Sequence, residues 1–225
     1  MKDKINNSSD WFFPAAFAEA KYNKPIIVRD TDSALGRYSL KTKEIGIIDI
    51  ARIHGHACDG LIIAYVETKA VLDKLFPDGV VDRTDLRVVA KNGPCWVDTV
   101  SMMTGARINF KTLKLDQSIG NGFIIQRIST GEAYDVHLQP GVFPAEQAAL
   151  EKKIRDARVK GDPVSADDID IDEKMADALS LKMLSTSPDE LLDIKPVKEF
   201  QFSPNDSVDV FGDRGDIINK DMPRN

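Results

Sequence analysis

Cysteine and histidine are scarce in this chain of 225 residues, which contains two of the first and three of the second. Two cysteines cannot build a disulfide-rich scaffold, and a cross-link between them would be unusual in a reducing compartment. Buried thiols or metal ligands are therefore the two interpretations left for Cys58 and Cys95. The scarcity also makes any clustering of these residues informative.

Long apolar runs and an excess of positive charge are also missing. No stretch approaches the roughly 20 uninterrupted apolar residues of a membrane-spanning helix. The polar start from Met1 to Asp10 precedes only a short apolar run, which argues against a cleaved secretory signal. A formal net charge of -6 argues against nucleic acid as the main partner, because phosphate binding needs a basic surface. We therefore expect a cytoplasmic protein with no membrane span and no nucleic-acid partner.

The histidines and cysteines that are present lie close together. Residues 53–60 read IHGHACDG, which places His54, His56 and Cys58 within five positions. Imidazole and thiolate are preferred ligands of zinc and other divalent transition metals, which take three or four ligands from segments that folding brings together. In an extended stretch the three side chains would project to the same side, because side chains alternate. We predict a metal site here, with Cys95 as a further ligand.

Two predicted helices and Asp98 support this site. The apolar pattern predicts helices over 59–76 and 96–104, so each cysteine directly precedes a helix, whose free N–H groups favour a thiolate. Asp98, three residues after Cys95, can hold a ligating imidazole as an outer carboxylate. The set is typical of a three-ligand site with an open position. The alternative is that the two histidines lie in a loop and both cysteines are small core residues.

The rest of the pattern predicts an α+β fold, with helices packed on a mixed or antiparallel sheet. Further helices are expected over 9–21, 43–53, 143–159, 173–184 and 188–194, and strands over 25–29, 86–91, 110–115, 122–128 and 133–138. The last three strands predict a β-meander. Three parts follow: an N-terminal extension (1–42), a metal-binding α+β domain (43–140), and a helical C-terminal extension with an acidic, extended or partly disordered tail (141–225).

Three segments resemble the FmdE family of formylmethanofuran dehydrogenase subunits, the FmdE-like domain. HGHACDGLIIAY matches the family's HGHxCPG motif, CWVDTVSMMTGARINFKTLKL carries its C-x-x-D and T-G turn, and GFIIQRISTGEAYDV is similar to its final strand pair. The resemblance covers Lys43 to Leu138. It implies an α+β fold with a zinc site, homodimers, and a loose association with molybdenum or tungsten enzyme operons. It also implies that the metal ligands come from His54, His56, Cys58 and Cys95, with Asp98 as the accompanying acid.

The chain departs from the family pattern in three ways. Asp59 stands where the family motif has proline, which adds either an anion beside the metal or a better helix cap, so we place Asp59 with Asp98 around the ligands. Ala106 stands where many relatives have a further cysteine. Residues 145–225 contain no cysteine or histidine, so the cysteine-rich ribbon of some relatives is absent.

Four functions are compatible with these residues. We favour a protein that binds zinc or another divalent metal and has an accessory role in metal or cofactor handling for a larger enzyme. The second is a metal-dependent enzyme, in which metal-bound water attacks a small molecule while Asp98 or Asp59 moves protons. The third is a thiol redox protein that uses Cys58 and Cys95. The fourth is a haem or other cofactor carrier with one of the clustered histidines as axial ligand.

His137 stands alone in a predicted strand and is expected to be structural.

Overall fold

The computed structural model describes residues 11–206 and 217–224. It confirms the predicted α+β class, with helices packed against mixed sheets. The helices are α1 (Ala15–Ala18), α2 (Ile47–His54), α3 (Asp59–Leu75), α4 (Pro94–Thr104), α5 (Ala145–Lys160), α6 (Ala166–Ser185) and α7 (Pro188–Leu191). The strands are β1 (Ile26–Arg29), β2 (Arg37–Ser39), β3 (Lys43–Ile45), β4 (Val80–Asp82), β5 (Leu86–Ala90), β6 (Leu113–Leu115), β7 (Phe123–Arg127), β8 (Ala133–Leu138), β9 (Leu192–Pro196) and β10 (Asn219–Arg224).

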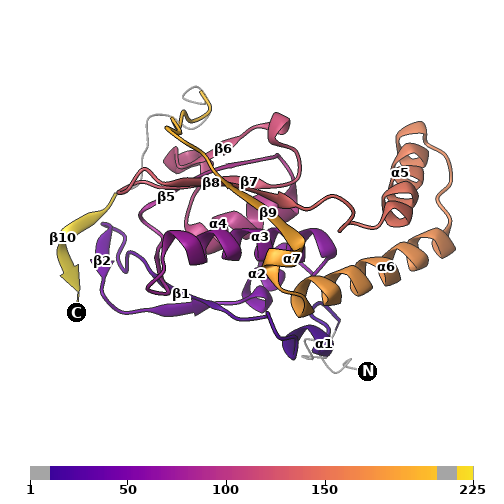
Figure 1. The fold of residues 1–225 in the computed structure, drawn as a ribbon, viewed down its shortest axis with the longest axis horizontal. Helices are drawn as coiled ribbons and strands as arrows, with labels where there is room; N and C mark the ends of the chain where they lie inside the picture. Colours follow the sequence, from indigo (N-terminus) through magenta and orange to yellow (C-terminus); the bar gives the residue numbers. More distant parts are fainter. Residues whose placement is uncertain (1–10, 207–216, 225) are drawn as a thin grey trace, which may run out of the picture.

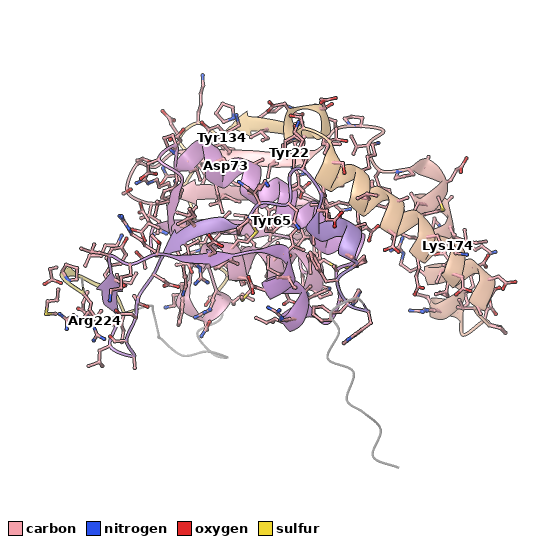
Figure 2. The ribbon with its side chains drawn as sticks, turned by 90° about the horizontal axis from the view of Figure 1, so that it is seen from below. Tyr22, Tyr65, Asp73, Tyr134, Lys174 and Arg224 are labelled. Atoms are coloured by element: carbon pink, nitrogen blue, oxygen red, sulfur yellow. The ribbon has the colours of Figure 1, made fainter. Side chains whose placement is uncertain are left out.

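Helix α3 is the centre of the fold. Its sequence pattern predicts one apolar face, but eight consecutive residues, 61–68, are all buried. The reason is that α4, α6 and β8 cover different sides of the helix, and a helix that is surrounded has no solvent face. Figure 2 shows Tyr65 of α3 within the body of the molecule, where its hydroxyl donates a hydrogen bond to the carbonyl oxygen of Lys24 at 2.6 Å.

A five-stranded sheet in the order β6-β5-β7-β8-β9 lies over α3 and α4 (Figure 1). The hairpin β7–β8 agrees with the predicted strand pair. The predicted meander is wrong, however, because β5 lies between β6 and β7, parallel to the first and antiparallel to the second. Leu86, Val88 and Val89 are buried on both faces of β5, which suits a strand with a neighbour on each side.

A second sheet, in the order β3-β1-β4, lies on the opposite side of the central helices. Residues 43–45, expected to begin a helix, instead pair with β1, so α2 starts only at Ile47. Strand β10 pairs in parallel with β2, which orders the last described part of the tail. The remainder of the predicted acidic tail, residues 207–216 and 225, lies outside the described residues.

Helices α5 and α6 form a hairpin that projects from one end of the molecule. Figure 2 shows Lys174 on this hairpin, and Arg224 of β10 at the opposite end. The C-terminal part of α6 packs on α3 through Leu179, Met183 and Leu184. Helix α6 starts at Ala166, so part of the expected acidic loop is helical. None of the described helices is both long enough and apolar enough to cross a bilayer.

The expected helix over 188–194 is only partly present. Helix α7 ends at Leu191, and the following residues form β9 against β8. Leu192 is buried and Ile194 packs against the core, so the apolar alternation of a strand determines the conformation here.

A candidate metal centre at two helix N-termini

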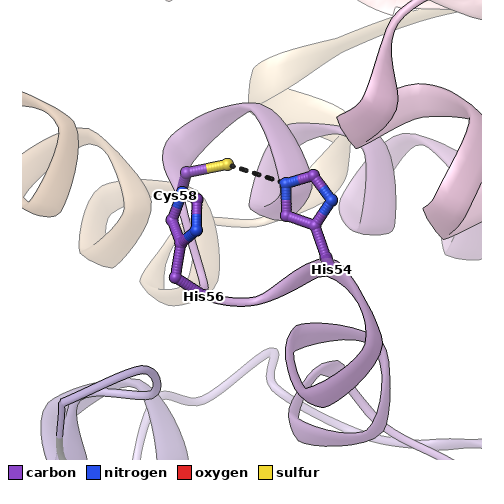
Figure 3. Close-up of side chains that lie close together, drawn as sticks. All are labelled: His54, His56 and Cys58. Carbon is purple, nitrogen blue, oxygen red and sulfur yellow. Dashed lines mark hydrogen bonds between the residues drawn. The ribbon is translucent and has the colours of Figure 1, made fainter.

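The candidate site lies at the junction between α2 and α3. His54 is the last residue of α2, and Cys58 is the N-cap of α3. The extended conformation expected for residues 54–58 is therefore wrong at its first residue. Gly55 turns the chain with φ of 113°, a backbone conformation that residues with a side chain rarely adopt. Figure 3 shows that this turn points His54 and Cys58 toward each other, with His56 beside Cys58.

Three ligand-type atoms form a compact triangle. The Sγ atoms of Cys58 and Cys95 are 3.5 Å apart. The Nε2 atom of His54 lies 3.8 Å from Cys58 Sγ and 3.7 Å from Cys95 Sγ. Cys95 is in the first turn of α4, so the N-termini of two helices converge on the triangle, as the sequence predicts. Neither cysteine forms a disulfide.

The dimensions of this triangle fit a tetrahedral zinc ion. Bond lengths of about 2.3 Å to sulfur and about 2.0 to 2.1 Å to nitrogen separate two sulfur ligands by about 3.8 Å, and a sulfur from a nitrogen by about 3.5 to 3.6 Å. The observed edges of 3.5, 3.7 and 3.8 Å agree within a few tenths of an ångström. Two thiolates and one imidazole would leave one tetrahedral position free.

His56 stands at the edge of the triangle. One ligand atom each from His54, His56 and Cys58 lie within 4.8 Å of one another. The ring centroids of the two histidines are 5.3 Å apart, and His56 is exposed whereas its neighbours are partly buried. His56 is thus near enough to serve as a fourth ligand after a side-chain rotation, or to leave that position open.

Asp98 fixes the orientation of the His54 ring. Its Oδ2 atom lies 2.8 Å from His54 Nδ1, so Nε2 faces the two sulfurs. Asp98 is one helical turn after Cys95 on α4, which brings ligand and carboxylate to the same face. Burial opposes protonation of His54, but hydrogen bonds with Asp98 and Cys58 outweigh it and raise its pKa.

The two thiols differ in their affinity for a proton. The hydrogen bond from the Cys95 thiol, together with the Leu61 backbone N–H and His54, lowers the pKa of Cys58. The hydrogen bond to Cys58 and burial raise the pKa of Cys95, because a second thiolate at this distance would be repelled. Without a cation Cys58 therefore gives up its proton more readily than Cys95. A divalent cation would relieve that repulsion and favour the second thiolate.

Asp59 does not point at the triangle. Its Oδ1 atom accepts a hydrogen bond from the backbone N–H of Gly60 at 2.7 Å. Its Oδ2 atom accepts one from Nε2 of Gln147 on α5, also at 2.7 Å. Cys58, not Asp59, is the N-cap of α3. The carboxylate that departs from the family motif thus connects α3 to α5.

A cavity of about 860 Å³ opens beside Cys95. It lies between the starts of α3 and α4, the end of β8 and the wall formed by α5. His137 lines it, with Nδ1 donating to the carbonyl oxygen of Asn121 at 2.8 Å. The charged residues of this cavity were not predicted from the sequence, because Lys91, Glu151 and Arg155 come from distant segments without a recognisable motif.

Fold and site together define an α+β protein with a candidate divalent-metal centre at two converging helix N-termini. The sequence model of FmdE, described as "FmdE, Molybdenum formylmethanofuran dehydrogenase operon", matches residues 53–193, more than half of the chain. The chain belongs to the FmdE family.

One solved structure gives a weaker comparison. The crystal structure of a tungsten formylmethanofuran dehydrogenase FmdE-like protein from Syntrophus aciditrophicus has 17% sequence identity, a TM-score of 0.39, and coverage of 72% of this chain and 76% of that chain. No curated protein matches the chain. The family assignment therefore rests on the sequence model.

Proposed function

We propose that this protein binds zinc or a chemically similar divalent ion and has an accessory role in metal or cofactor handling for a larger enzyme. The observation that supports it is the triangle of His54 Nε2, Cys58 Sγ and Cys95 Sγ, whose edges match a tetrahedral ion. His56 is the candidate fourth ligand. The accessory role is supported by the family description, which names an operon that encodes a metalloenzyme.

The positions of the acids favour this role over hydrolysis. Asp98 is paired with His54, and Asp59 accepts from Gly60 and Gln147, so both carboxylates already have hydrogen-bond partners within the protein. When bound, the ion would supply Lewis acidity and a position for one additional ligand. The residues of the chain would hold it: Asp98 orients the imidazole, and the two helix N-termini stabilise the thiolates.

Metal analysis of protein purified without chelators tests the proposal. We expect about one equivalent of zinc in the wild type, and a large loss in Cys58→Ser and in Cys95→Ser, each measured by plasma mass spectrometry. His137→Gln is the control, because it removes a histidine that lies outside the triangle. Substoichiometric metal in the wild type, or equal metal content in all four proteins, would refute a resident metal.

A metal-dependent enzyme that acts on a small molecule is the second candidate, because the cavity borders the Cys95 side of the triangle. The two candidates differ in the coordination shell. X-ray absorption spectroscopy of the metal-loaded protein distinguishes a closed shell of two sulfurs and two histidine nitrogens from a shell with an exchangeable light atom. A closed shell that persists with small ligands present would count against the enzyme.

The proposal also includes a homodimer, a larger metalloenzyme as partner, and a cytoplasmic location. Sedimentation analysis tests the homodimer, and co-purification from the native cell tests the metalloenzyme partner. A strictly monomeric protein without associated metalloenzyme subunits would contradict the first two.

A further inference from the structure

We propose that the cavity beside Cys95 is a binding site for a small organic anion with an apolar body, carrying a carboxylate or phosphate group. Its volume of about 860 Å³ is within the usual range of small-molecule sites. Both an apolar wall and charged groups line it, which is the composition expected for a ligand of mixed character.

The balance of charge in the cavity favours an anion. Lys91 and Arg155 line it, and neither has an ion-pair partner within residues 11–206 and 217–224. The two lining acids compensate them poorly. Asp59 is already satisfied by Gly60 and Gln147, and burial together with Asp59 and Asp172 raises the pKa of Glu151, although Arg155 and Gln147 act in the opposite direction. A partly buried Lys91 and an exposed Arg155 thus face the cavity with no carboxylate of the described residues within ion-pair distance.

The ammonium group of Lys91 is held in place. Its Nζ atom lies 3.4 Å from the centroid of the Trp96 ring and is in contact with Oδ1 of Asn121. Both partners are neutral, so they orient the charge without cancelling it. A partly buried cation with this environment gains by pairing with an anionic group of a ligand.

The opposite wall belongs to α5, and a polar contact joins it to the metal-site helix. Gln147 is fully buried, and its hydrogen bond to Asp59 joins α5 to the first turn of α3. Arg155 lies two turns further along α5, which also packs against α6. The apolar part of a ligand would lie against Ile63 and Phe143, between the two walls.

The cavity also reaches the candidate metal site. Cys95 and Gly60 line it, so a ligand held by Lys91 and Arg155 extends toward the sulfur of Cys95. A donor atom at that end would lie near the free coordination position. This last point rests on the metal site proposed above, whereas recognition of the anionic group does not.

Binding of matched probes tests the anion site. Benzoate and phenyl phosphate carry the two anionic groups, and benzamide has nearly the shape of benzoate without its charge. We expect ligand-detected NMR titration to show at least one anion binding about tenfold or more tightly than benzamide, as a charge-assisted hydrogen bond implies. The preferred anion distinguishes carboxylate from phosphate recognition.

Variants of the two cations complete this test. Arg155→Ala and Lys91→Met should each weaken binding of the preferred anion about tenfold. Arg158→Ala is the control, since Arg158 is exposed on the same helix and does not line the cavity. The proposal is overturned if neither anion binds at millimolar concentration, if benzamide binds equally well, or if all three variants behave alike. Circular dichroism confirms that each variant is folded.

Cobalt(II) substitution separates the anion site from the metal site. If both exist, the cobalt-loaded protein shows thiolate-to-cobalt absorption bands, and the preferred anion shifts them. Bands that do not shift, with anion binding intact, would refute contact between ligand and metal. Absence of the bands, with anion binding intact, would refute the metal site and leave the anion site standing.

Discussion

Asp98 and Asp135 each face a histidine at 2.8 Å, yet only the histidine that Asp98 contacts lies beside the two thiols. Removing Asp98 leaves His54 free to rotate and makes its Nε2 atom a weaker donor, so we expect Asp98→Ala to lower zinc affinity about 10- to 100-fold. Competition with a chromophoric chelator measures this affinity.

Asp135→Ala is the matched control for Asp98→Ala. It removes an equivalent carboxylate from His137 and should leave zinc affinity unchanged. If both variants bind zinc as tightly as the wild type, then the Asp98 carboxylate does not support a ligand. A loss of affinity in both would indicate a general effect on folding, which thermal denaturation of the metal-free proteins would reveal.

Some residues of the candidate site lie in short sequence motifs, whereas others come from distant parts of the chain. His54, Cys58, Cys95 and Asp98 were predicted because two short motifs contain rare residue types at ligand-like spacing. Residues 54–58 are not extended throughout, since a helix end and a turn at Gly55 bring the side chains together. The role of Gln147 had no local pattern, because it depends on α5 returning to the start of α3.

At the level of secondary structure, the site depends on the close approach of α3 and α4. A Cβ atom added at Gly60 would lie 3.0 Å from Cys95 Sγ and 3.3 Å from Cys95 Cβ. We expect Gly60→Ala to push the two helix starts apart and to weaken zinc binding about tenfold, since such overpacking costs about 1–3 kcal/mol. Alanine is also the better helix former by about 0.5–1 kcal/mol, which offsets part of the cost to folding. The metal affinity should therefore fall more than the thermal stability.

Gly46→Ala is the control for the substitution at Gly60. Gly46 precedes α2, the helix that carries His54, and an added Cβ there would meet its nearest atoms only at 3.8 Å. Zinc affinity close to that of the wild type is expected for this variant. If Gly60→Ala binds zinc equally well, then the close contact with Cys95 is not what sets the separation of the sulfurs.

Helices were predicted better than strands, for a physical reason. The helices α3 and α4 have several turns of apolar periodicity and end at proline or glycine, so local sequence defines them. The strands that were not predicted, β2, β3, β4, β9 and β10, have three to six residues each. Their partners are distant in the chain, as for β10 with β2, so no local pattern specifies them.

At the level of the whole molecule, α3 is covered on every side, and the carboxyl group of Glu67 on this helix therefore lies in the interior. Glu67 is fully buried, and no side chain of the described residues donates a hydrogen bond to its carboxyl group. Burial raises its pKa well above the usual value, although the backbone of Leu138 and the charge of Lys91 act in the opposite direction. An amphipathic interpretation of the sequence would have placed this residue toward solvent.

The buried Glu67 should make stability depend on pH. Its pKa is higher in the folded state, so the folded protein retains a proton that the unfolded chain has lost above about pH 4.3. The associated stability is complete below that pH and declines as the pH rises toward the folded-state pKa. Urea unfolding at pH 5 and pH 8 should show this decline in the wild type.

Glu67→Gln, which is neutral throughout, should remove this component of the pH dependence. At pH 8 we expect it to be more stable than the wild type by about 1–3 kcal/mol, with a smaller difference at pH 5, because the unfolded wild-type chain gains about 1.4 kcal/mol per pH unit by ionising Glu67 up to the folded-state pKa, whereas glutamine is neutral in both states. Glu146→Gln on the exposed side of α5 removes the same charge without relieving any burial, so its pH profile should parallel that of the wild type. A Glu67→Gln variant that is less stable than the wild type at pH 8 but not at pH 5 would contradict this account and would mean that the folded protein holds Glu67 ionised near Lys91.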